Sequence, residues 1–172
     1  MKFSEIPQFP RCPYRTDVDW DYLERHIKCA ESELGLNLEP DFQRAHVWTA
    51  AQQTAYVEYI LKGGTSGKEL YFNHPGWMRD WQGEYVIVDG KQRLQAVRLF
   101  MADEIPAFGL WRHEYEGNPS IMTASFSWNI AALATRVEVL QWYLAFNAGG
   151  IAHTSDELAR VEALLIMELN ND

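Results

Sequence analysis

At 172 residues, with 47% hydrophobic and 23% charged residues, the chain has the size and composition of one folded domain. Its formal net charge of -9 disfavours DNA as a partner, because duplex binding depends mainly on cations that contact phosphates. Two cysteines, Cys12 and Cys29, are too few for a disulfide framework, and no apolar run approaches the roughly 20 residues that span a bilayer. We therefore expect a single cytoplasmic domain over residues 1–172, with reduced thiols and no membrane partner.

The N-terminal segment, residues 1–16, contains three prolines and is predicted to be extended. A helix is predicted to start at Asp17, because the acidic residues of its first turn suit the positive end of the helix dipole, and to end at Gly35. The alternating segment 36–40 predicts a short strand, which Pro40 would stop.

A second helix is predicted after Thr49, which forms a capping box with Gln52 three residues later. Residues 69–73 have the composition of a strand. A tryptophan-rich loop over residues 74–83 follows and precedes the central part of the chain, so it is a candidate rim for a site.

The centre of the sequence predicts a strand that runs directly into a helix. Residues 85–88 are aromatic and β-branched, as in a buried strand, whereas Leu94, Val97 and Phe100 recur at helical spacing. The polar residues 89–93 must therefore lie at the junction between strand and helix.

The C-terminal half predicts further strands and two helices. Strands are expected at residues 104–108, 110–115 and 125–133, the first at a sheet edge because it contains a proline. Thr135 is expected to cap one helix, and Thr154 with Glu157 to form a capping box that opens the last. Because strands and helices do not alternate regularly, the pattern favours an α+β fold with a small mixed sheet.

The junction at residues 89–93 carries the chemistry expected of a phosphate site. A helix N-terminus presents unpaired backbone N–H groups, Gly90 lets the backbone approach a ligand, and Lys91 and Arg93 add cationic donors. An equally open interpretation is a tight turn in which Asp89 is the N-cap and the two cations are solvated.

The common motifs for phosphate or metal are missing from the sequence. Neither a Walker A pattern nor a dinucleotide GxGxxG follows any strand, and the five histidines lack the spacing of a zinc site. Asp17, Asp19 and Asp21 are better interpreted as a helix start than as a metal site.

Three polar clusters remain, each where a loop meets a helix: residues 42–48, 89–93 and 147–150. Such clusters are usually caps and turns, but three of them favour one composite site. We expect phosphate oxygens to be held by Arg44, Lys91 and Arg93, Asp89 to bind Mg²⁺ or orient water, and Trp48 to stack on a base or shape the wall.

These clusters occur in a characteristic order. Phe-Gln-Arg-x-x-x-Trp at 42–48 is followed by Val-Asp-Gly-Lys-Gln-Arg-Leu at 88–94, then by Phe-Asn-Ala-Gly-Gly at 146–150 and Thr-x-x-Glu-Leu just beyond. In this order the chain resembles the ParB/sulfiredoxin-like superfamily and, within it, the GmrSD-type N-terminal domain, which is typified by Asp-Gly-Gln-Gln-Arg. Lys91 departs from that pattern. Sulfiredoxins carry their catalytic cysteine at the same place, so sulfinic acid reduction is excluded.

The resemblance implies a ParB/sulfiredoxin-like fold whose strand-to-helix turn binds a nucleoside triphosphate, with Mg²⁺ as cofactor. By motif match the catalytic residues are Asp89, Gln92 and Arg93, and Asp89 is also the metal ligand. The nucleotide-binding residues that the motifs imply are Gln43, Arg44, Gly90, Asn147, Gly149 and Gly150, and the chemistry of the residues adds Trp48 and Lys91.

Three functions are open at this point. The first is a GmrSD/ParB-like domain that hydrolyses a nucleoside triphosphate or transfers its phosphate, in phage defence or in the metabolism of modified DNA. The second is a non-catalytic regulatory or partner-binding module. The third is a DNA-nicking endonuclease, which the acidic charge and the lack of a nuclease motif disfavour. The resemblance also implies a separate C-terminal nuclease, for which the sequence leaves no room after the helix at Thr154. We therefore expect the effector to be a separate protein chain or the domain's own pocket.

Overall fold

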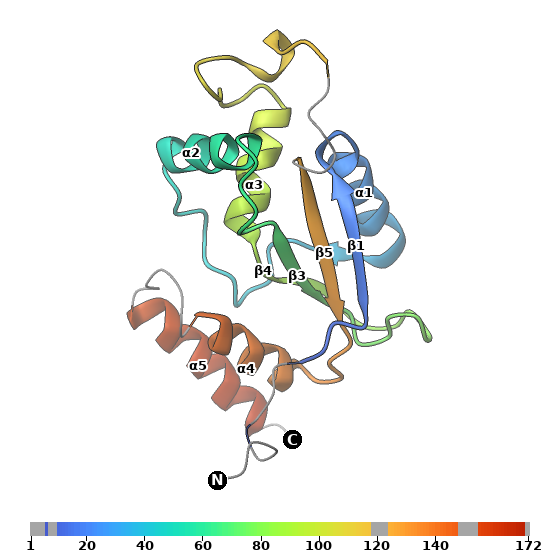
Figure 1. Cartoon of the computed structure of the whole chain (residues 1–172). Coiled ribbons are helices and arrows are strands. Elements are labelled where there is room, and N and C mark those ends of the chain that lie inside the picture. The colour runs from blue at the N-terminus through green and yellow to red at the C-terminus, as the bar shows by residue number, and fades with distance from the viewer. Residues whose placement is uncertain (1–5, 7–9, 118–123, 148–154, 171–172) are drawn as a thin grey trace.

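A five-stranded mixed sheet with the strand order β1-β5-β3-β4-β2 organises the fold (Figure 1). The structure is a computed structural model, and it describes residue 6 and residues 10–117, 124–147 and 155–170. β1 pairs antiparallel with β5 and β3 with β4, whereas the pairs β3–β5 and β2–β4 are parallel. The strands are β1 (Tyr14–Asp19), β2 (Leu36–Asn37), β3 (Glu69–Asn73), β4 (Tyr85–Asp89) and β5 (Ser125–Ala131), and the helices are α1 (Trp20–Leu34), α2 (Ala50–Leu61), α3 (Lys91–Met101), the 3-10 helix η2 (Arg112–Glu114), α4 (Arg136–Asn147) and α5 (Ser155–Leu169).

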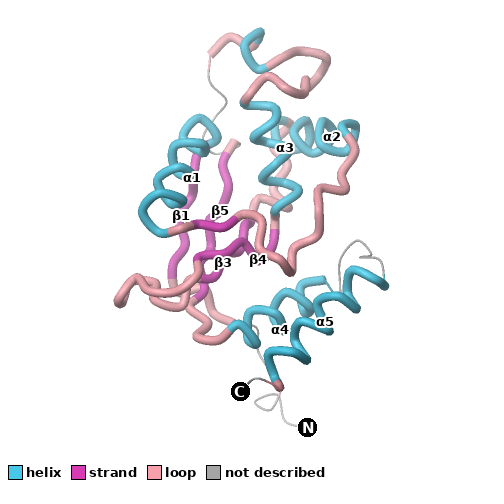
Figure 2. The backbone as a smooth tube through the Cα atoms, turned by 180° about the vertical axis from the view of Figure 1, so that it is seen from behind, coloured by secondary structure: helices cyan, strands magenta, loops and turns pink. Residues whose placement is uncertain are grey.

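Helices α1 and α3 lie on one face of the sheet, and α2 packs against α3 (Figure 2). Their apolar stripes pack against strand residues that point to the same side, and the resulting cluster is the larger of the two hydrophobic cores. At its centre Trp128 stacks on Phe72 with ring centroids 3.9 Å apart, and its indole Nε1 donates to the Tyr85 hydroxyl at 2.7 Å. β5 is buried along its whole length, which fixes the register of the sheet.

The opposite face of the sheet is only partly covered. α4 and α5 pack over one end of it, where Val86, Val88 and Ala131 meet Leu140 and Val161 in a second hydrophobic cluster (Figure 1). The rest of this face, over β1, β5 and β3, carries no helix of the described chain. Among the described residues, no helix has the length and apolar character needed to cross a membrane.

The predicted α+β class and mixed sheet are confirmed. The junction of β4 and α3 is as expected, and so are β3, β5 and the helix after Thr135. The predicted short strand at 36–40 is confirmed only as β2. The capping box of Thr49 and Gln52 at the start of α2 is also present. The predicted box at Thr154 and the first residues of the N-terminal segment lie outside the described residues.

The prediction that the first helix starts at Asp17 is wrong. Residues 14–19 form strand β1, and α1 begins at Trp20 with Asp19 as its N-cap, whose side chain accepts from the backbone N–H of Asp21 at 2.8 Å. The acidic residues belong partly to a strand because β1 pairs with β5 over six residues, a long-range contact that local composition does not reveal.

Two predicted strands, at 104–108 and 110–115, are also wrong. The segment forms a tight turn in which Ala107 and Leu110 make an isolated antiparallel bridge, and residues 112–114 form η2. Asp103 and Phe108 have positive φ angles of 59° and 50°, which no strand allows. The Tyr115 hydroxyl donates to the carbonyl of Ala107 at 2.5 Å and fixes the turn.

Candidate functional site

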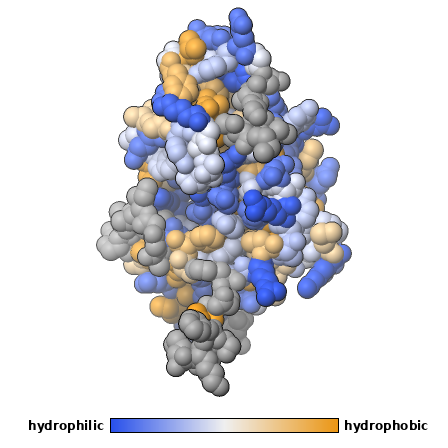
Figure 3. Space-filling model, in the orientation of Figure 1, coloured by the Kyte–Doolittle hydropathy of each residue, from blue (hydrophilic) through white to orange (hydrophobic). Residues whose placement is uncertain are grey.

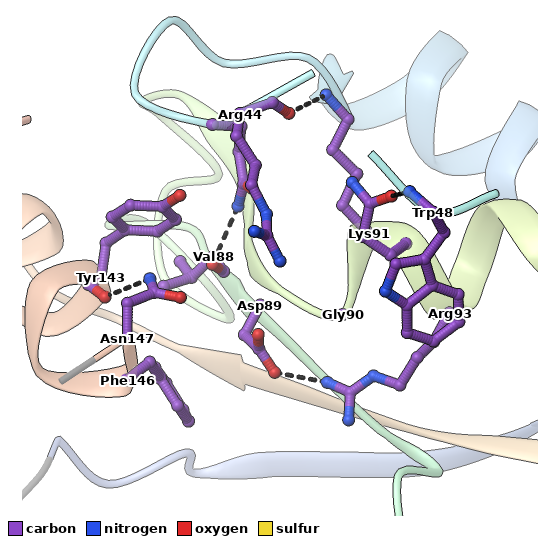
Figure 4. A pocket seen from close by; sticks show the side chains of 12 residues that line it. Arg44, Trp48, Val88, Asp89, Gly90, Lys91, Arg93, Tyr143, Phe146 and Asn147 are labelled. Atoms are coloured by element: carbon purple, nitrogen blue, oxygen red, sulfur yellow. Dashed lines mark hydrogen bonds and ion pairs between the residues drawn. The ribbon is translucent and has the colours of Figure 1, made fainter. Parts of the chain in front are cut away.

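A cavity of about 290 Å³ lies at the carboxyl end of β4, where the strand meets α3 (Figure 4). Its floor is the β4–α3 junction, one wall is the loop of residues 43–48, and the facing wall is the C-terminal part of α4. The cavity therefore lies between the two hydrophobic clusters, because α3 belongs to the larger cluster and α4 to the smaller one. The lining residues are Gln43, Arg44, Trp48, Val88, Asp89, Gly90, Lys91, Gln92, Arg93, Tyr143, Phe146 and Asn147.

The structure brings together members of all three polar clusters predicted from the sequence. Nine of the predicted site residues line this one cavity. The other two, Gly149 and Gly150, lie outside the described residues. Sequence reasoning missed Val88, Tyr143 and Phe146, since all three have the spacing of ordinary core residues, and only the fold shows that they border the polar clusters.

Gly90 is required at the floor of the cavity. It has a left-handed backbone with φ of 102°, which side chains rarely adopt. A Cβ atom at this position would also lie 2.4 Å from Cδ2 of Leu70, a fully buried core residue. Glycine thus lets the chain turn from β4 directly into α3.

The first turn of α3 has no capping side chain. Its N-cap is Gly90, and no side-chain hydrogen bond caps the helix, so the interpretation in which Asp89 is the N-cap is wrong. The first N–H groups of a helix have no partner within the helix, and the macrodipole adds partial positive charge there. Because Gly90, Lys91 and Gln92 line the cavity, this end of the helix presents unpaired N–H groups and partial positive charge to it, an arrangement that suits an anion.

A β-bulge turns Asp89 toward the cavity. In the pairing of β3 with β4, Phe72 faces Ile87 but Tyr71 faces Asp89, so Val88 and Asp89 together oppose Tyr71. A bulge of this kind redirects a side chain at the end of a strand. Asp89 Oδ2 accepts from Nη2 of Arg93 one turn along α3, and the side chains of the pair keep 33% and 21% exposure (Figure 4).

Gln92 holds the 43–48 loop against α3. Its Oε1 accepts from the backbone N–H groups of Val47 and Trp48 at 3.0 and 3.3 Å, and its Nε2 donates to the carbonyl of Ala45 at 3.1 Å. Both ends of the amide are thus occupied by the loop backbone. Gln92 thereby fixes the wall that contains Arg44 and Trp48.

Gln43 and Lys91 are also bound to the scaffold. Gln43 is buried, and its Nε2 donates to the carbonyls of Ile87 and Val88 at 3.1 and 2.8 Å. Lys91 is 6% exposed, and its ammonium contacts Glu39 and the carbonyl of Arg44. A buried ammonium needs such partners. Lys91 therefore anchors the backbone of the 43–48 loop through the carbonyl of Arg44.

Arg44 brings a second guanidinium to the cavity. Its side chain points into the space above Asp89 (Figure 4). Nη1 lies 4.0 Å from a carboxylate oxygen of Glu157, which belongs to α5. Arg44 and Arg93 therefore approach the uncapped end of α3 from two sides.

Aromatic side chains flank this charged floor. Trp48 packs against Tyr56 with ring centroids 5.6 Å apart on one side. Tyr143 and Phe146 project from α4 on the other, where Asn147 Nδ2 donates to the Tyr143 carbonyl at 2.7 Å. Burial raises the pKa of the Tyr143 hydroxyl, so it stays protonated and able to donate.

The donor set limits how a metal ion could be held. Of the described residues that line the cavity, Asp89 alone has a carboxylate. Among the residues that the structure describes, no three His, Cys, Asp or Glu side chains are arranged so that they could hold a metal ion together. Mg²⁺ is commonly held by one or two carboxylates together with substrate phosphates. The site therefore fits a magnesium ion that arrives with a phosphorylated ligand.

The fold and the cavity define an α+β domain with a polar cavity at a strand-to-helix junction. The family model of the GmrSD restriction endonuclease N-terminal domain matches residues 26–147, which include the whole described cavity. The chain belongs to this family. No match was found among curated proteins or among solved structures.

Proposed function

We propose that the cavity binds a nucleoside triphosphate together with Mg²⁺ and that the domain hydrolyses the nucleotide or transfers its phosphate. The observation that carries the proposal is the uncapped N-terminus of α3 with Arg44 and Arg93 beside it. Backbone N–H groups and guanidinium groups are the usual ligands of phosphate oxygens. Membership of a family named for a restriction endonuclease supports a context of defence against phage or of DNA modification.

The phosphates would replace an existing ion pair. Asp89 and Arg93 are both partly exposed, so their pairing contributes no more than about 1 kcal/mol. A triphosphate carries more charge than one carboxylate and would draw Arg93 away at small cost. Asp89 would then be available to a metal ion or to water.

The base would lie between the aromatic walls. Trp48 offers a flat surface to one side of the cavity, and Tyr143 a hydroxyl donor on the other. This arrangement suits the part of a nucleotide that is planar and weakly charged. The cationic floor suits the phosphate chain.

In the hydrolytic step a water molecule attacks the γ-phosphorus, and the bond from this atom to the bridging oxygen of the diphosphate breaks. Asp89 accepts a hydrogen bond from the water and takes its proton. Bound Mg²⁺ would neutralise charge on the phosphate oxygens. Arg44 and Arg93 stabilise the negative charge that moves onto the leaving nucleoside diphosphate. The products of the reaction are nucleoside diphosphate and inorganic phosphate.

Gln43, Lys91 and Gln92 would act in a different way from the arginines. All three bind backbone carbonyl or N–H groups of the cavity walls. We assign them a positioning role, in which they keep the 43–48 loop and the end of β4 in place. Their substitution should lower affinity by loosening the wall rather than by removing a phosphate contact.

Binding without turnover is the second candidate. The contact between Asp89 and Arg93 favours it, because Oδ2 of Asp89 is then occupied by the guanidinium and is not directed at a water molecule. In that case the domain would be a nucleotide-responsive regulatory module. Asp89→Asn separates the candidates, since it should reduce phosphate release and leave affinity nearly intact only if Asp89 acts in catalysis.

The first experiment is thermal melting of the full chain with Mg²⁺ and each of the four nucleoside triphosphates. One nucleotide should raise the melting temperature by several degrees, because a ligand that binds only the folded state stabilises it. Arg93→Ala should remove the shift. Arg98→Ala, on the same helix but paired with Glu24 on α1, is the matched control and should retain it. Absence of a shift with every nucleotide would contradict the proposal.

A further inference from the structure

A second, larger hollow lies on the face of the sheet that α4 and α5 leave open. It measures about 420 Å³ and runs over β3, β5 and β1. Hydrophilic residues gather across the centre of this face (Figure 3). The residues that line this polar groove are Arg15, Asp17, Thr65, Lys68, Glu69, Ser125 and Ser127.

The strand register assembles the groove. Glu69 on β3 faces Ser127 on β5, and Ser127 faces Asp17 on β1. Residues paired across neighbouring strands point to the same face of a sheet, so these three side chains form one row. Arg15 stands beside this row and pairs in register with Asn129.

The floor of the groove is fixed by hydrogen bonds. Ser127 Oγ donates to Asp17 Oδ1 at 2.6 Å and accepts from Arg15 Nη2 at 3.0 Å. Ser125 and Ser127 are each only 7% exposed. Open sheet faces commonly carry polar residues, but their side chains are then well solvated. Here the hydroxyl groups of Ser125 and Ser127 lie at the bottom of a hollow, where a ligand in the hollow can reach them.

The groove borders the phosphate cavity. Its segment 65–69 contacts the floor of that cavity, since a Cβ atom on Gly67 would lie 3.6 Å from Nη1 of Arg93. A Cβ atom on Gly90 would lie 3.4 Å from the carbonyl oxygen of Glu69. Both hollows therefore lie at the same end of the sheet, with Arg93 between them.

The chemistry of the groove selects a class of ligand. No aromatic or aliphatic side chain is among the described residues that line it, so a base or an acyl chain finds no partner there. Charges of both signs and three hydroxyl groups suit a small, strongly hydrophilic molecule that carries hydroxyl groups of its own.

We infer that this polar groove binds a hydroxyl-bearing small molecule that accepts the γ-phosphate of the nucleotide in the neighbouring cavity. The inference rests on the proposed function and goes beyond it, because it makes the domain a phosphotransferase with a second substrate. The acceptor hydroxyl oxygen forms a bond to the γ-phosphorus, and the bond from phosphorus to the bridging oxygen breaks. Nucleoside diphosphate leaves, and the hydroxyl proton passes to Asp89.

The test is incubation of the full chain with Mg²⁺, the γ-labelled nucleoside triphosphate that stabilises it, and a deproteinised bacterial extract of small molecules. The label should appear in a new organic phosphate that chromatography separates from inorganic phosphate. Arg15→Gln and Ser127→Leu should lower its formation about tenfold or more, since each removes a polar contact from the groove. Both variants should keep the melting shift with the nucleotide.

Arg25→Gln, an exposed arginine on α1, is the matched control and should leave the product unchanged. Label that appears only in inorganic phosphate would overturn the inference but leave the proposed function in place. The same organic phosphate from both groove variants would overturn it as well. If no nucleoside triphosphate raises the melting temperature of the unmodified chain, the proposed function itself has failed. Direct binding is checked by ligand-observed NMR with D-ribose and glycerol, whose signals should be perturbed less by Arg15→Gln than by the unmodified chain.

Discussion

The N-termini of α2 and α3 both adjoin the 43–48 loop, which leads into α2 and is bound by Gln92 of α3, but they are built in opposite ways. α2 starts at a complete capping box, in which Thr49 Oγ1 accepts from the backbone N–H of Gln52 and Gln52 Oε1 accepts from that of Thr49. α3 starts at a glycine with no capping side chain. Capping serves stability, because it satisfies donors that the helix cannot satisfy itself.

The difference between the two helices shows where the fold keeps its hydrogen-bond donors available. α1 is capped by Asp19, and α4 is preceded by Thr135, whose hydroxyl accepts from the N–H of Glu138 at 3.2 Å. Among α1, α2, α3 and α4, α3 is the helix without a capping side chain, and its first turn lines the cavity. The comparison thus predicts that changes at α3 alter ligand binding and that changes at α2 alter stability alone.

The largest effect is expected for Gly90→Ala. The left-handed backbone and the 2.4 Å approach to Leu70 should together lower the free energy of unfolding by about 3 kcal/mol. Gly109→Ala is the matched control, because Gly109 has φ of 77° but nothing within 4 Å of its Cβ position, and it should lose only about 1 kcal/mol. Urea denaturation measures both, and equal losses would contradict the claim of a packed junction.

Arg93→Ala should weaken nucleotide binding by about 2 to 3 kcal/mol, roughly 30- to 150-fold, because a charge-assisted hydrogen bond to phosphate is lost. The substitution also leaves Asp89 without its Arg93 partner, so that its negative charge would oppose the phosphates of the proposed ligand. Isothermal titration calorimetry with the stabilising nucleotide measures the change. An affinity equal to that of Arg98→Ala would refute a phosphate contact by Arg93.

Thr49→Ala should cost about 1 kcal/mol of stability, the usual contribution of an N-cap. Nucleotide affinity should stay within about twofold of the unmodified chain, since the cap does not line the cavity. Denaturation and calorimetry on the same preparation check the two parts. A large loss of affinity would mean that the two helix starts are coupled through the 43–48 loop.

The smallest effect is on the pH dependence of the free energy of unfolding. It involves His74, which belongs to neither helix start. Burial lowers the pKa of His74 from its ordinary value of 6.5. Below this value the unfolded chain binds a proton that the folded chain excludes, so the free energy of unfolding should fall as the pH falls through 6.5 toward the folded-state pKa.

His74→Gln should reduce this loss of stability without abolishing it, because burial lowers the pKa of His26 in the same direction. Urea denaturation at about pH 7.5 and about pH 5.5 compares the two proteins. An equal loss in both would exclude His74 as a source of the pH dependence.

The sequence predicted which polar residues meet in one cavity better than it predicted the edges of the fold. Residues 89–93 were recognisable because local patterns dictate a strand, a glycine turn and a helix in succession. β1 was not, since its polar residues gain their structure from pairing with β5, more than a hundred residues away. The turn at 103–110 resembled a strand because its positive φ angles fall on residues other than glycine at two positions.

Within the site, residue types were predictable but their partners were not. Lys91 has the chemistry of a phosphate ligand, yet Glu39 and the Arg44 carbonyl surround its ammonium. No local pattern reveals that Glu39, 52 residues away, lies beside it. Long-range contacts of this kind decide whether a cation faces a ligand or supports a wall.

The most direct measurement is the response of backbone amide signals in a ¹H–¹⁵N NMR spectrum to the stabilising nucleotide and Mg²⁺. Our account predicts large shifts for the N–H groups of Lys91, Gln92 and Arg93 at the start of α3. The N–H groups of Ala50 and Gln52 at the capped start of α2 should hardly change. Unchanged α3 signals at saturating nucleotide would contradict the claim that this helix start binds phosphate.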